Sequence, residues 1–374
     1  MMRPRICVAL SVTLVALLAV VAALSPAPAP AQARTFVWKV QSAFPVTDYP
    51  HRSLVELAKS IEQMSGGRLK IEALPVGSVV GFFEVLDAVH RGALDGGLGW
   101  PGLWAGKNSA AGLFGSPLGG PFGMGQNEFT AWLFSGGGQE LYNELLQKEL
   151  KMDVVSYFTT VQPFWEAFGW VKKPVNNLED LRRLKFRSSG IGLEMFRRMG
   201  ASTVGMPGGD IVPSLERGVI DGAEWAIPSR DIVMGFQQAA KYYYMPSFRQ
   251  PPTFHELIIN RKKWAELPPD LQAIVRYAAL AEITRLAAYT VDQDSQAAEE
   301  LATKHGVKIL RTPDEILRAE LEAIDKVLDA EAQKNPFFAR VLGAQREYAK
   351  KTVAHAQKMT PPMEIAVRHY WQKK

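Results

Sequence analysis

Arg187 is the side chain of this sequence that is best suited to hold an organic anion. It ends the run Arg183–Arg187 (RLKFR), whose alternation predicts a short strand, and Ser188-Ser189-Gly190 follows as a turn that opens a helix. Open α/β sheets bind ligands at the ends of strands, and a planar guanidinium matches a carboxylate with two parallel hydrogen bonds. We therefore expect Arg187 to bind a carboxylate. A surface salt bridge is the alternative role.

A carboxylate stands at a second predicted strand end. Glu224 and Trp225 follow the Asp-Gly pair at 221–222 after one residue, Ala223. An unpaired negative charge beside a large aromatic ring would be costly, so Glu224 needs a cation. If Arg187 serves the substrate, a metal ion held by Glu224, a main-chain carbonyl and the ligand can supply the positive charge.

Glu166 and Glu256 are two further carboxylates with unusual neighbours. Each is set among apolar or aromatic residues, in 164–168 (FWEAF) and 254–258 (FHELI). Both are therefore candidates for the same cation or ligand. Taken singly, each could also be a partly exposed carboxylate without a role in binding.

Motifs for catalysis are missing from the sequence. It contains no phosphate-binding loop of the Walker type, no nucleotide-binding glycine fingerprint, no zinc-type His pair and no nucleophile elbow. Ser188 could be offered as a nucleophile, but no His with a carboxylate partner can be assigned to it. We expect a binding protein and not an enzyme. The alternative from another class is an exported hydrolase that uses Ser188 or Glu166.

The N-terminus has the features of an export signal. Arg3 and Arg5 precede an apolar run at 6–24, and a Pro/Ala-rich stretch leads to Ala31-Gln32-Ala33, so we predict cleavage near Ala33 and a periplasmic mature protein. The single cysteine, Cys7, is removed with the signal, which excludes disulfides and thiol chemistry. The signal contains two of the 43 basic residues and none of the 38 acidic ones, so the remaining charge is nearly balanced and scattered. A nucleic-acid surface is not expected.

Two stretches of the sequence resemble each other and predict two similar α/β lobes. Residues 85–97 (VLDAVHRGALDGG) and 211–223 (IVPSLERGVIDGA) each give a helix, a glycine placed for a left-handed C-terminal cap, and an Asp-Gly pair that opens a strand. Shorter alternating runs at 68–72 and 183–187 precede them and complete the predicted duplication. A cleft between two such lobes is a natural ligand site, because closure of the lobes excludes water.

The C-terminal third is predicted to be mainly helical. A broad apolar stripe runs from Pro268 to about Lys304, and a short strand follows at 307–310. Further helices are expected from Pro313 to near Lys334 and from about Pro336 to Lys358. These helices could wrap the lobes or pair with another subunit.

Seven segments, read together, carry a family resemblance. They are 65–68 (SGGR), 83–96, 121–124 (PFGM), 136–142 (GGGQELY), 185–187 (KFR), 221–225 (DGAEW) and 258–264 (IINRKKW). With them the chain resembles the extracytoplasmic solute-binding subunits of tripartite ATP-independent periplasmic (TRAP) transporters, in the branch that binds 2-oxo acids and related monocarboxylates. The resemblance implies two α/β lobes with the ligand cleft between them, joined by crossing strands and a long helix.

This fold divides the sequence into four predicted parts. Residues 1–33 form the signal peptide, 34–158 the first lobe and 159–245 the second lobe. Residues 246–374 contain a crossover strand that returns to the first lobe, the long connecting helix and the C-terminal helices. In related proteins such C-terminal helices can pair subunits, so a homodimer is an open expectation.

The resemblance also implies roles for site residues. Arg187 matches the family's carboxylate-binding arginine, and Glu224 with the Trp225 carbonyl matches two ligands of a cation, calcium or sodium, that bridges ligand and protein. The family's remaining side-chain ligand is usually a glutamine four residues before a tryptophan, and here Glu166 stands in that place. A second carboxylate favours a divalent ion such as calcium, or alters the ligand. Gln162 is a further candidate for the amide oxygen.

We predict a receptor for a small 2-oxo or 2-hydroxy monocarboxylate, such as pyruvate or lactate, that delivers its ligand to TRAP membrane subunits. The predicted substrate contacts are Arg187, Glu166, Gln162, Trp100, Phe44, Trp225 and Glu256, and the predicted metal ligands are Glu166, Glu224, Trp225 and Glu256. Phe44, Trp100 and Trp225 would form apolar walls, and Gly102 would leave room for a larger ligand. A metal-independent receptor for dicarboxylates or sugar acids and a sensory module remain as alternatives.

Overall fold

The computed structural model describes residues 34–115, 122–206 and 208–372. The predicted signal peptide at 1–33 lies outside these residues. The chain divides into two compact units after Phe36, and the second unit, Val37–Lys374, contains both β-sheets apart from Phe36 itself. In the described part of the chain, none of the helices combines the length and apolar character needed to cross a membrane.

The first sheet contains five strands in the order β2-β1-β3-β10-β4. Their bounds are β1 Phe36–Ser42, β2 Leu69–Leu74, β3 Gly96–Gly99, β4 Val154–Gln162 and β10 Thr253–Asn260. β1 and β3 are parallel, whereas β10 runs antiparallel to both β3 and β4. All residues of β10 are buried, as expected for a strand inside a covered sheet.

The second sheet contains six strands in the order β11-β9-β5-β8-β6-β7. Their bounds are β5 Gly169–Val171, β6 Lys185–Ser188, β7 Ser202–Gly205, β8 Gly222–Ala223, β9 Tyr242–Met245 and β11 Lys308–Arg311. β6 lies parallel to both β7 and β8, while β5 runs antiparallel to β8 and β9. The predicted α/β class with two sheets is confirmed.

The two sheets share one arrangement of strands. The order β2-β1-β3 in the first sheet repeats as β7-β6-β8 in the second. Gly92 and Gly218 adopt the left-handed φ values predicted for them, 77° and 71°. The carboxylates of Asp95 and Asp221 each accept a hydrogen bond from the backbone of the neighbouring strand. The Asp-Gly pair therefore recurs because it joins adjacent parallel strands.

One part of the predicted duplication is wrong. The runs at 68–72 and 183–187 form β2 and β6, but β2 lies at the edge of its sheet, whereas β6 lies between β8 and β7. The counterpart of β6 is β1. Short alternating strands resemble one another whatever their place in a sheet, so the sequence similarity gave a false pairing.

Each sheet also contains a strand from beyond its own run of sequence. β10 follows β5–β9 of the second sheet but lies in the first, and β11 follows β10 but lies in the second. β4 itself continues to Gln162, so the predicted lobe boundary at residue 158 falls inside a strand. The chain therefore passes between the sheets more than once.

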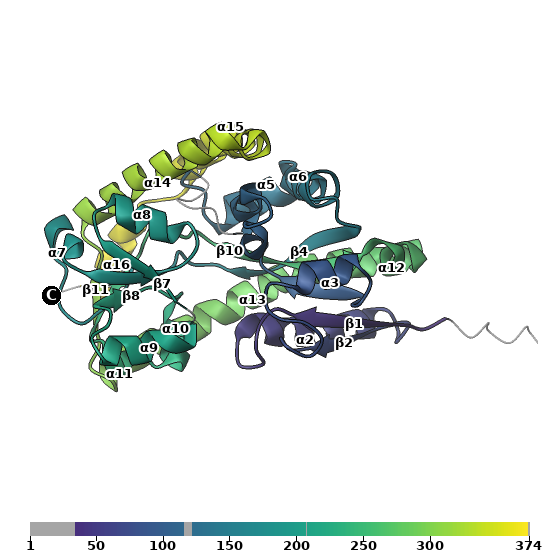
Figure 1. Ribbon diagram of the computed structural model, residues 1–374, viewed down its shortest axis with the longest axis horizontal. Coiled ribbons are helices and arrows are strands. Elements are labelled where there is room, and N and C mark those ends of the chain that lie inside the picture. The colour runs from purple at the N-terminus through teal and green to yellow at the C-terminus, as the bar shows by residue number, and fades with distance from the viewer. Residues whose placement is uncertain (1–33, 116–121, 207, 373–374) are drawn as a thin grey trace, which may run out of the picture. The chain divides into compact units, whose positions relative to one another are not determined.

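Helices cover both sheets (Figure 1). Those in the first half are α2 Tyr49–Met64, α3 Val85–His90, α4 Gly112–Gly115, α5 Gln126–Ser135 and α6 Gly138–Glu144. Those around the second sheet are α7 Leu178–Arg182, α8 Gly192–Arg198, α9 Gly208–Glu216, α10 Pro228–Met234 and α11 Phe236–Ala239. α12 is Arg261–Glu266. The Asp48 carboxylate caps the N-terminus of α2 at Tyr49.

The C-terminal helices have nearly the predicted bounds. α13 spans Pro269–Thr303, α14 Asp314–Lys334 and α15 Pro336–Met359. α13 packs against α2 and β4 near the first sheet and against α10 beside the second sheet (Figure 1). A further helix, α16 Met363–Trp371, was not predicted, and it has no buried residue.

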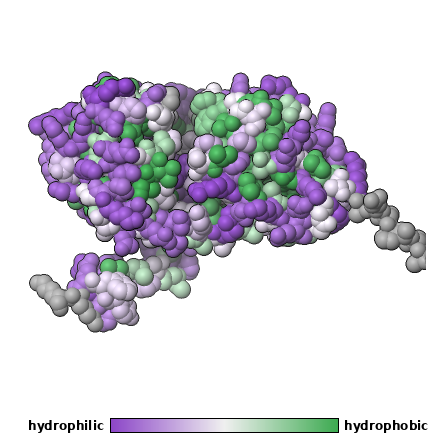
Figure 2. Space-filling view, turned by 90° about the horizontal axis from the view of Figure 1, so that it is seen from below, coloured by the Kyte–Doolittle hydropathy of each residue, from purple (hydrophilic) through white to green (hydrophobic). Residues whose placement is uncertain are grey.

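Large aromatic side chains fill the interior beside both sheets. Trp170 of β5 stacks on Tyr243 of β9 with ring centroids 4.1 Å apart, and its Nε1 donates a hydrogen bond to the buried Asp231. Truncating such a residue to alanine costs about 3–5 kcal/mol of folding free energy. The face in Figure 2 carries mainly hydrophilic residues, with smaller groups of apolar ones between them.

Candidate functional site

Arg187 lies at the carboxyl ends of three parallel strands. It stands on β6 beside Val204 of β7 and Ala223 of β8. Its Nε and Nη2 donate to the Met206 carbonyl at 3.2 and 3.0 Å, and its Nη1 donates to the Glu224 carbonyl at 2.9 Å. The guanidinium is 4% exposed, so the backbone beyond the strand ends fixes the orientation of a buried positive charge.

The surroundings of Arg187 shift its pKa and cover one side of it. Burial lowers the pKa of the guanidinium below its ordinary value, and the Glu224 carboxylate opposes this shift. The Trp225 ring lies 5.5 Å from the guanidinium, within the range of a cation–π contact. Of the three predicted wall residues, Trp225 is thus the one in contact with Arg187.

Glu224 is almost fully buried and has three donors around its carboxylate. Oε1 accepts from the Ser188 hydroxyl at 2.9 Å and from Arg187 Nη1 at 3.4 Å. Oε2 lies 3.3 Å from Nη2 of Arg249. The positive charge that the sequence demands for Glu224 is therefore supplied by two arginines of the chain itself.

Glu166 lies between β4 and β5 and reaches the same arginine. Its Oε2 accepts from Arg249 Nη2 at 2.6 Å, and its Oε1 accepts from Gln250 Nε2 at 2.7 Å and from Gln162 Nε2 at 3.4 Å. Burial raises the pKa of the Glu166 carboxyl, and the Arg249 charge opposes that rise. The structure thus brings Glu166, Glu224 and Gln162 into one cluster with Arg187.

Gln162 extends this cluster toward the first sheet. Its Oε1 lies 3.3 Å from Nη1 of Arg230 on α10. Nη2 of the same arginine donates to the Asp48 carboxylate at 2.7 Å, and the guanidinium lies 5.0 Å from the centre of the Tyr49 ring. An ion pair therefore joins the N-terminus of α2 to α10.

Glu256 has a different set of partners from the other predicted site residues. Its Oε1 accepts from Trp104 Nε1 at 2.8 Å and from the Tyr142 hydroxyl at 2.5 Å, and its Oε2 accepts from the Ser156 hydroxyl at 2.5 Å. Burial raises the pKa of Glu256 to about 7. None of these three partners is a member of the cluster around Arg187, so Glu256 lies outside that cluster.

Phe44 and Trp100 pack against residues near the first sheet. Phe44 is buried and contacts the edges of Phe82 and His255, with centroids 5.9 and 5.2 Å away. The Trp100 indole covers Gly102, where an added Cβ would lie 2.5 Å from the ring. The expectation that Gly102 leaves room for a ligand is wrong, because Trp100 itself fills that space.

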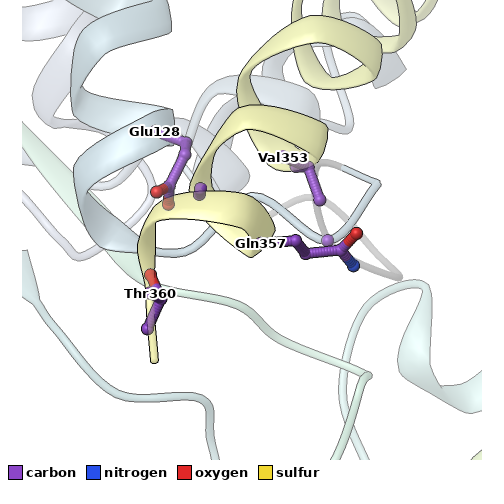
Figure 3. A pocket seen from close by; sticks show the side chains of 6 residues that line it. Glu128, Val353, Gln357 and Thr360 are labelled. Atoms are coloured by element: carbon purple, nitrogen blue, oxygen red, sulfur yellow. The ribbon is translucent and has the colours of Figure 1, made fainter. Parts of the chain in front are cut away.

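A surface hollow lies away from these residues, between α5 and the end of α15. Figure 3 shows Glu128, Val353, Gln357 and Thr360 around it. It is lined by none of the residues predicted for the ligand or the metal.

The oxygen atoms of the cluster suit a hard cation, but their present partners do not leave them free. Calcium takes six to eight oxygen ligands, roughly 2.3–2.6 Å away. Arg249 already contacts both Glu166 and Glu224, the two carboxylates predicted to bind a cation. Among the described residues, no group of three or more His, Cys, Asp or Glu side chains is arranged to hold a metal.

Arg249 and Gln250 are the site residues that the sequence analysis missed. They lie between β9 and β10, far in sequence from Glu166 and Glu224. The signal that could have found them is an Arg-Gln pair between Pro246 and Pro251, at a passage from one sheet to the other. Ser188 was weighed only as a nucleophile, but its hydroxyl donates to Glu224.

A buried, oriented arginine at strand ends suits the capture of an anion, and the hydroxyl of the adjacent Ser188 donates to a carboxylate. The fold and the site thus define an anion-binding receptor. The chain belongs to the bacterial extracellular solute-binding proteins of family 7, whose family model matches residues 41–335. This is a periplasmic family of TRAP transporter receptors, and the protein is a TRAP solute-binding protein, not an enzyme.

Three relatives are similar over most of their length. A monocarboxylate 2-oxoacid-binding periplasmic protein of Nostoc sp. is 29% identical over 318 residues, which cover 85% of each chain. A TRAP solute-binding protein of Bordetella bronchiseptica, solved as a mixed-occupancy dimer with calcium and picolinate, is 28% identical with a TM-score of 0.79, covering 90% of this chain and 97% of that one. One of Pseudoalteromonas atlantica, with sodium and pyruvate, is 26% identical with a TM-score of 0.79, covering 90% and 100%. The two solved relatives thus contain calcium or sodium together with a small carboxylate.

Proposed function

We propose that this receptor binds a small 2-oxo or 2-hydroxy monocarboxylate of the size of pyruvate or lactate and delivers it to TRAP membrane subunits. The observation that carries this proposal is the buried Arg187 guanidinium at the ends of three parallel strands, oriented by the Met206 and Glu224 carbonyls. The ligands named for the Nostoc and Pseudoalteromonas relatives, a 2-oxo acid and pyruvate, support the ligand class.

The residues around Arg187 explain how such a ligand would be held. A carboxylate that meets a buried guanidinium gains charge-assisted hydrogen bonds that water weakens little. The two carbonyls restrict rotation of the guanidinium, so little side-chain entropy is lost on binding. The indole of Trp225 covers the guanidinium and supplies an apolar surface for a short carbon chain.

The proposal is tested by calorimetric titration of the protein with pyruvate, lactate, a dicarboxylate and a sugar acid. In Arg187→Met the affinity for the preferred monocarboxylate should fall by about 30-fold or more, since losing one partner of a buried charge pair costs about 2–5 kcal/mol. Arg187→Lys keeps the positive charge but loses the planar guanidinium with its paired donors. Its affinity for the same ligand should therefore fall by less than that of Arg187→Met. Arg197→Met removes an exposed arginine of α8 and serves as the control.

The result has to separate binding from folding, because Arg187 also holds two carbonyls. Thermal unfolding of each variant without ligand shows whether it folds, and the shift on adding ligand reports binding to the folded state. Unchanged affinity in a folded Arg187→Met would refute the role of Arg187. Preference for a dicarboxylate or a sugar acid would refute the ligand class.

We also propose that the protein forms a homodimer through its C-terminal helices. α16 exposes apolar side chains along its whole length, including Met363, Ile365, Tyr370 and Trp371. A second copy would cover them, and the Bordetella relative crystallised as a dimer. Light scattering should give a dimer for the full mature chain and a monomer for a chain ending at Thr360. Equal masses for the two would refute the proposal.

We further propose that the protein is exported to the periplasm and that its signal peptide is cleaved near Ala33. The periplasmic family of the chain supports it. N-terminal sequencing of the protein recovered from the periplasm tests the position, and a mature N-terminus far from Arg34 would refute it.

A further inference from the structure

Arg249 lies between the two carboxylates that would share a cation. Its Nη2 atom is 2.6 Å from Oε2 of Glu166 and 3.3 Å from Oε2 of Glu224. One nitrogen of the chain thus contacts an oxygen of each carboxylate, as a bridging cation would. The side chain is 4% exposed, so this is an interior contact rather than a surface ion pair.

The other oxygens of the pair are also occupied. Oε1 of Glu224 accepts from Ser188 and Arg187, and Oε1 of Glu166 accepts from Gln250 and Gln162. A metal ion could enter only by displacing Arg249 and reorganising these donors. With Arg249 in place, two positive and two negative side chains face one another. Without it, two buried carboxylates would face Arg187 alone, which is a costly arrangement.

The backbone around Arg249 is fixed on both sides. Glu320 of α14 accepts from the Ser247 hydroxyl at 2.6 Å and from the Phe248 backbone N–H at 2.7 Å. The Glu166 backbone N–H donates to the Gln250 carbonyl, and the Glu166 carbonyl accepts from the Ser247 N–H, each at 3.0 Å. Arg249 is therefore held in position before any ligand arrives.

The Arg249 side chain also has a donor to spare. Its Nε is buried and has no hydrogen-bond partner among the described residues. A buried N–H without an acceptor costs free energy, which an oxygen of a bound anion would recover. Arg249 can thus contribute a hydrogen bond to the ligand as well as a charge to the carboxylate pair.

We propose that Arg249 takes the place of the bridging cation in this receptor, so that Arg187 and Arg249 bind a carboxylate without a metal ion. The Glu166–Glu224 pair then becomes a metal site only when Arg249 is removed. The part of this inference that concerns the ligand rests on the proposed function, whereas the part that concerns the metal does not.

The first experiment measures metal binding without any organic ligand. Calcium is titrated calorimetrically into the metal-free mature protein, into Arg249→Met and into the control Arg197→Met. We expect no calcium binding to the wild type or the control, and one calcium per chain in Arg249→Met, because its two carboxylates have lost a shared counter-charge. Stoichiometric calcium binding to the wild type, or none to a folded Arg249→Met, would overturn the proposal.

The second experiment measures pyruvate affinity with calcium and, separately, with chelator in sodium-free buffer. The wild type should bind equally well in both, to within about threefold. In chelator the pyruvate affinity of Arg249→Met should be lower than that of the wild type by about 30-fold or more, as expected for truncating a buried charge pair. Added calcium should restore this affinity. A wild type that needs calcium or sodium to bind pyruvate would overturn the proposal.

A second variant keeps the test decisive if Arg249→Met does not fold. The double variant Glu166→Gln/Arg249→Met removes one charge of each sign, so the net charge of the interior is unchanged. We expect its pyruvate binding to require calcium or sodium, and binding independent of both would overturn the proposal. If the wild type binds no pyruvate in either buffer, the proposed ligand class fails, while the calcium titration still decides the role of Arg249.

Discussion

Replacing Glu256 by glutamine tests whether this residue contributes to the stability of the fold or to ligand binding. In Glu256→Gln the amide oxygen can accept from Trp104 and Tyr142, and the amide nitrogen can donate to Ser156, so the three hydrogen bonds are kept. The substitution therefore removes a titrating proton from the interior without removing a contact. It mimics the protonated carboxyl at every pH.

The expected magnitude follows from the pKa of Glu256, which burial raises from the ordinary 4.5 to about 7. Between these values the folded protein keeps a proton that the unfolded chain has lost, so stability is present at low pH and is lost as pH rises through about 7. Each unit of pKa corresponds to about 1.4 kcal/mol, which makes the loss about 3 kcal/mol in the wild type and none at this position in the variant.

The assay is urea unfolding of wild type and Glu256→Gln from about pH 5 to about pH 8, a range that spans the titration. As pH rises across this range, the free energy of unfolding of the variant minus that of the wild type should increase by about 2–3 kcal/mol. Other buried carboxyls titrate in both proteins and cancel in the difference. Parallel pH curves would refute the assigned titration, and a tenfold or greater loss of ligand affinity would return Glu256 to the binding site.

Two further predictions concern the packing around the site. Asp48→Asn removes the charge that pairs with Arg230 and should speed ligand release about fivefold, the effect of about 1 kcal/mol, as measured by stopped-flow fluorescence. An unchanged release rate would show that this ion pair does not slow release of the ligand. Gly102→Ala places a Cβ 2.5 Å from the Trp100 ring and should destabilise the protein by about 1–3 kcal/mol in urea unfolding. Gly106→Ala, with nothing within 4 Å of its Cβ, is the control, and equal stability of the two variants would contradict the packing argument.

Local sequence signals were enough to predict the elements that depend on local chemistry. The prolines and apolar stripes of the C-terminal third predicted α13, α14 and α15 to within about two residues, the usual uncertainty of helix ends. Arg187 was placed at a strand end because the alternation of its run is a local property. Glycine caps at Gly92 and Gly218 were predicted for the same reason.

Partners that meet across the fold could not be predicted in the same way. The sequence shows Glu256 among apolar residues, but its partners Trp104, Tyr142 and Ser156 lie 100 or more residues away in sequence. Arg249 was missed because its neighbours between Pro246 and Pro251 mark a turn of the chain but do not show that Glu166 is its partner. Sequence indicated that the carboxylates need a positive charge, and only the fold shows which side chain provides it.

The position of β10 has a consequence for how the chain is made. β10 lies between β3 and β4, so the first sheet remains in two pieces until Thr253–Asn260 has left the ribosome. Until then the inner edges of β3 and β4 have no partner, and exposed strand edges are prone to pair with other chains. Folding of the first sheet must therefore follow synthesis of about two thirds of the sequence.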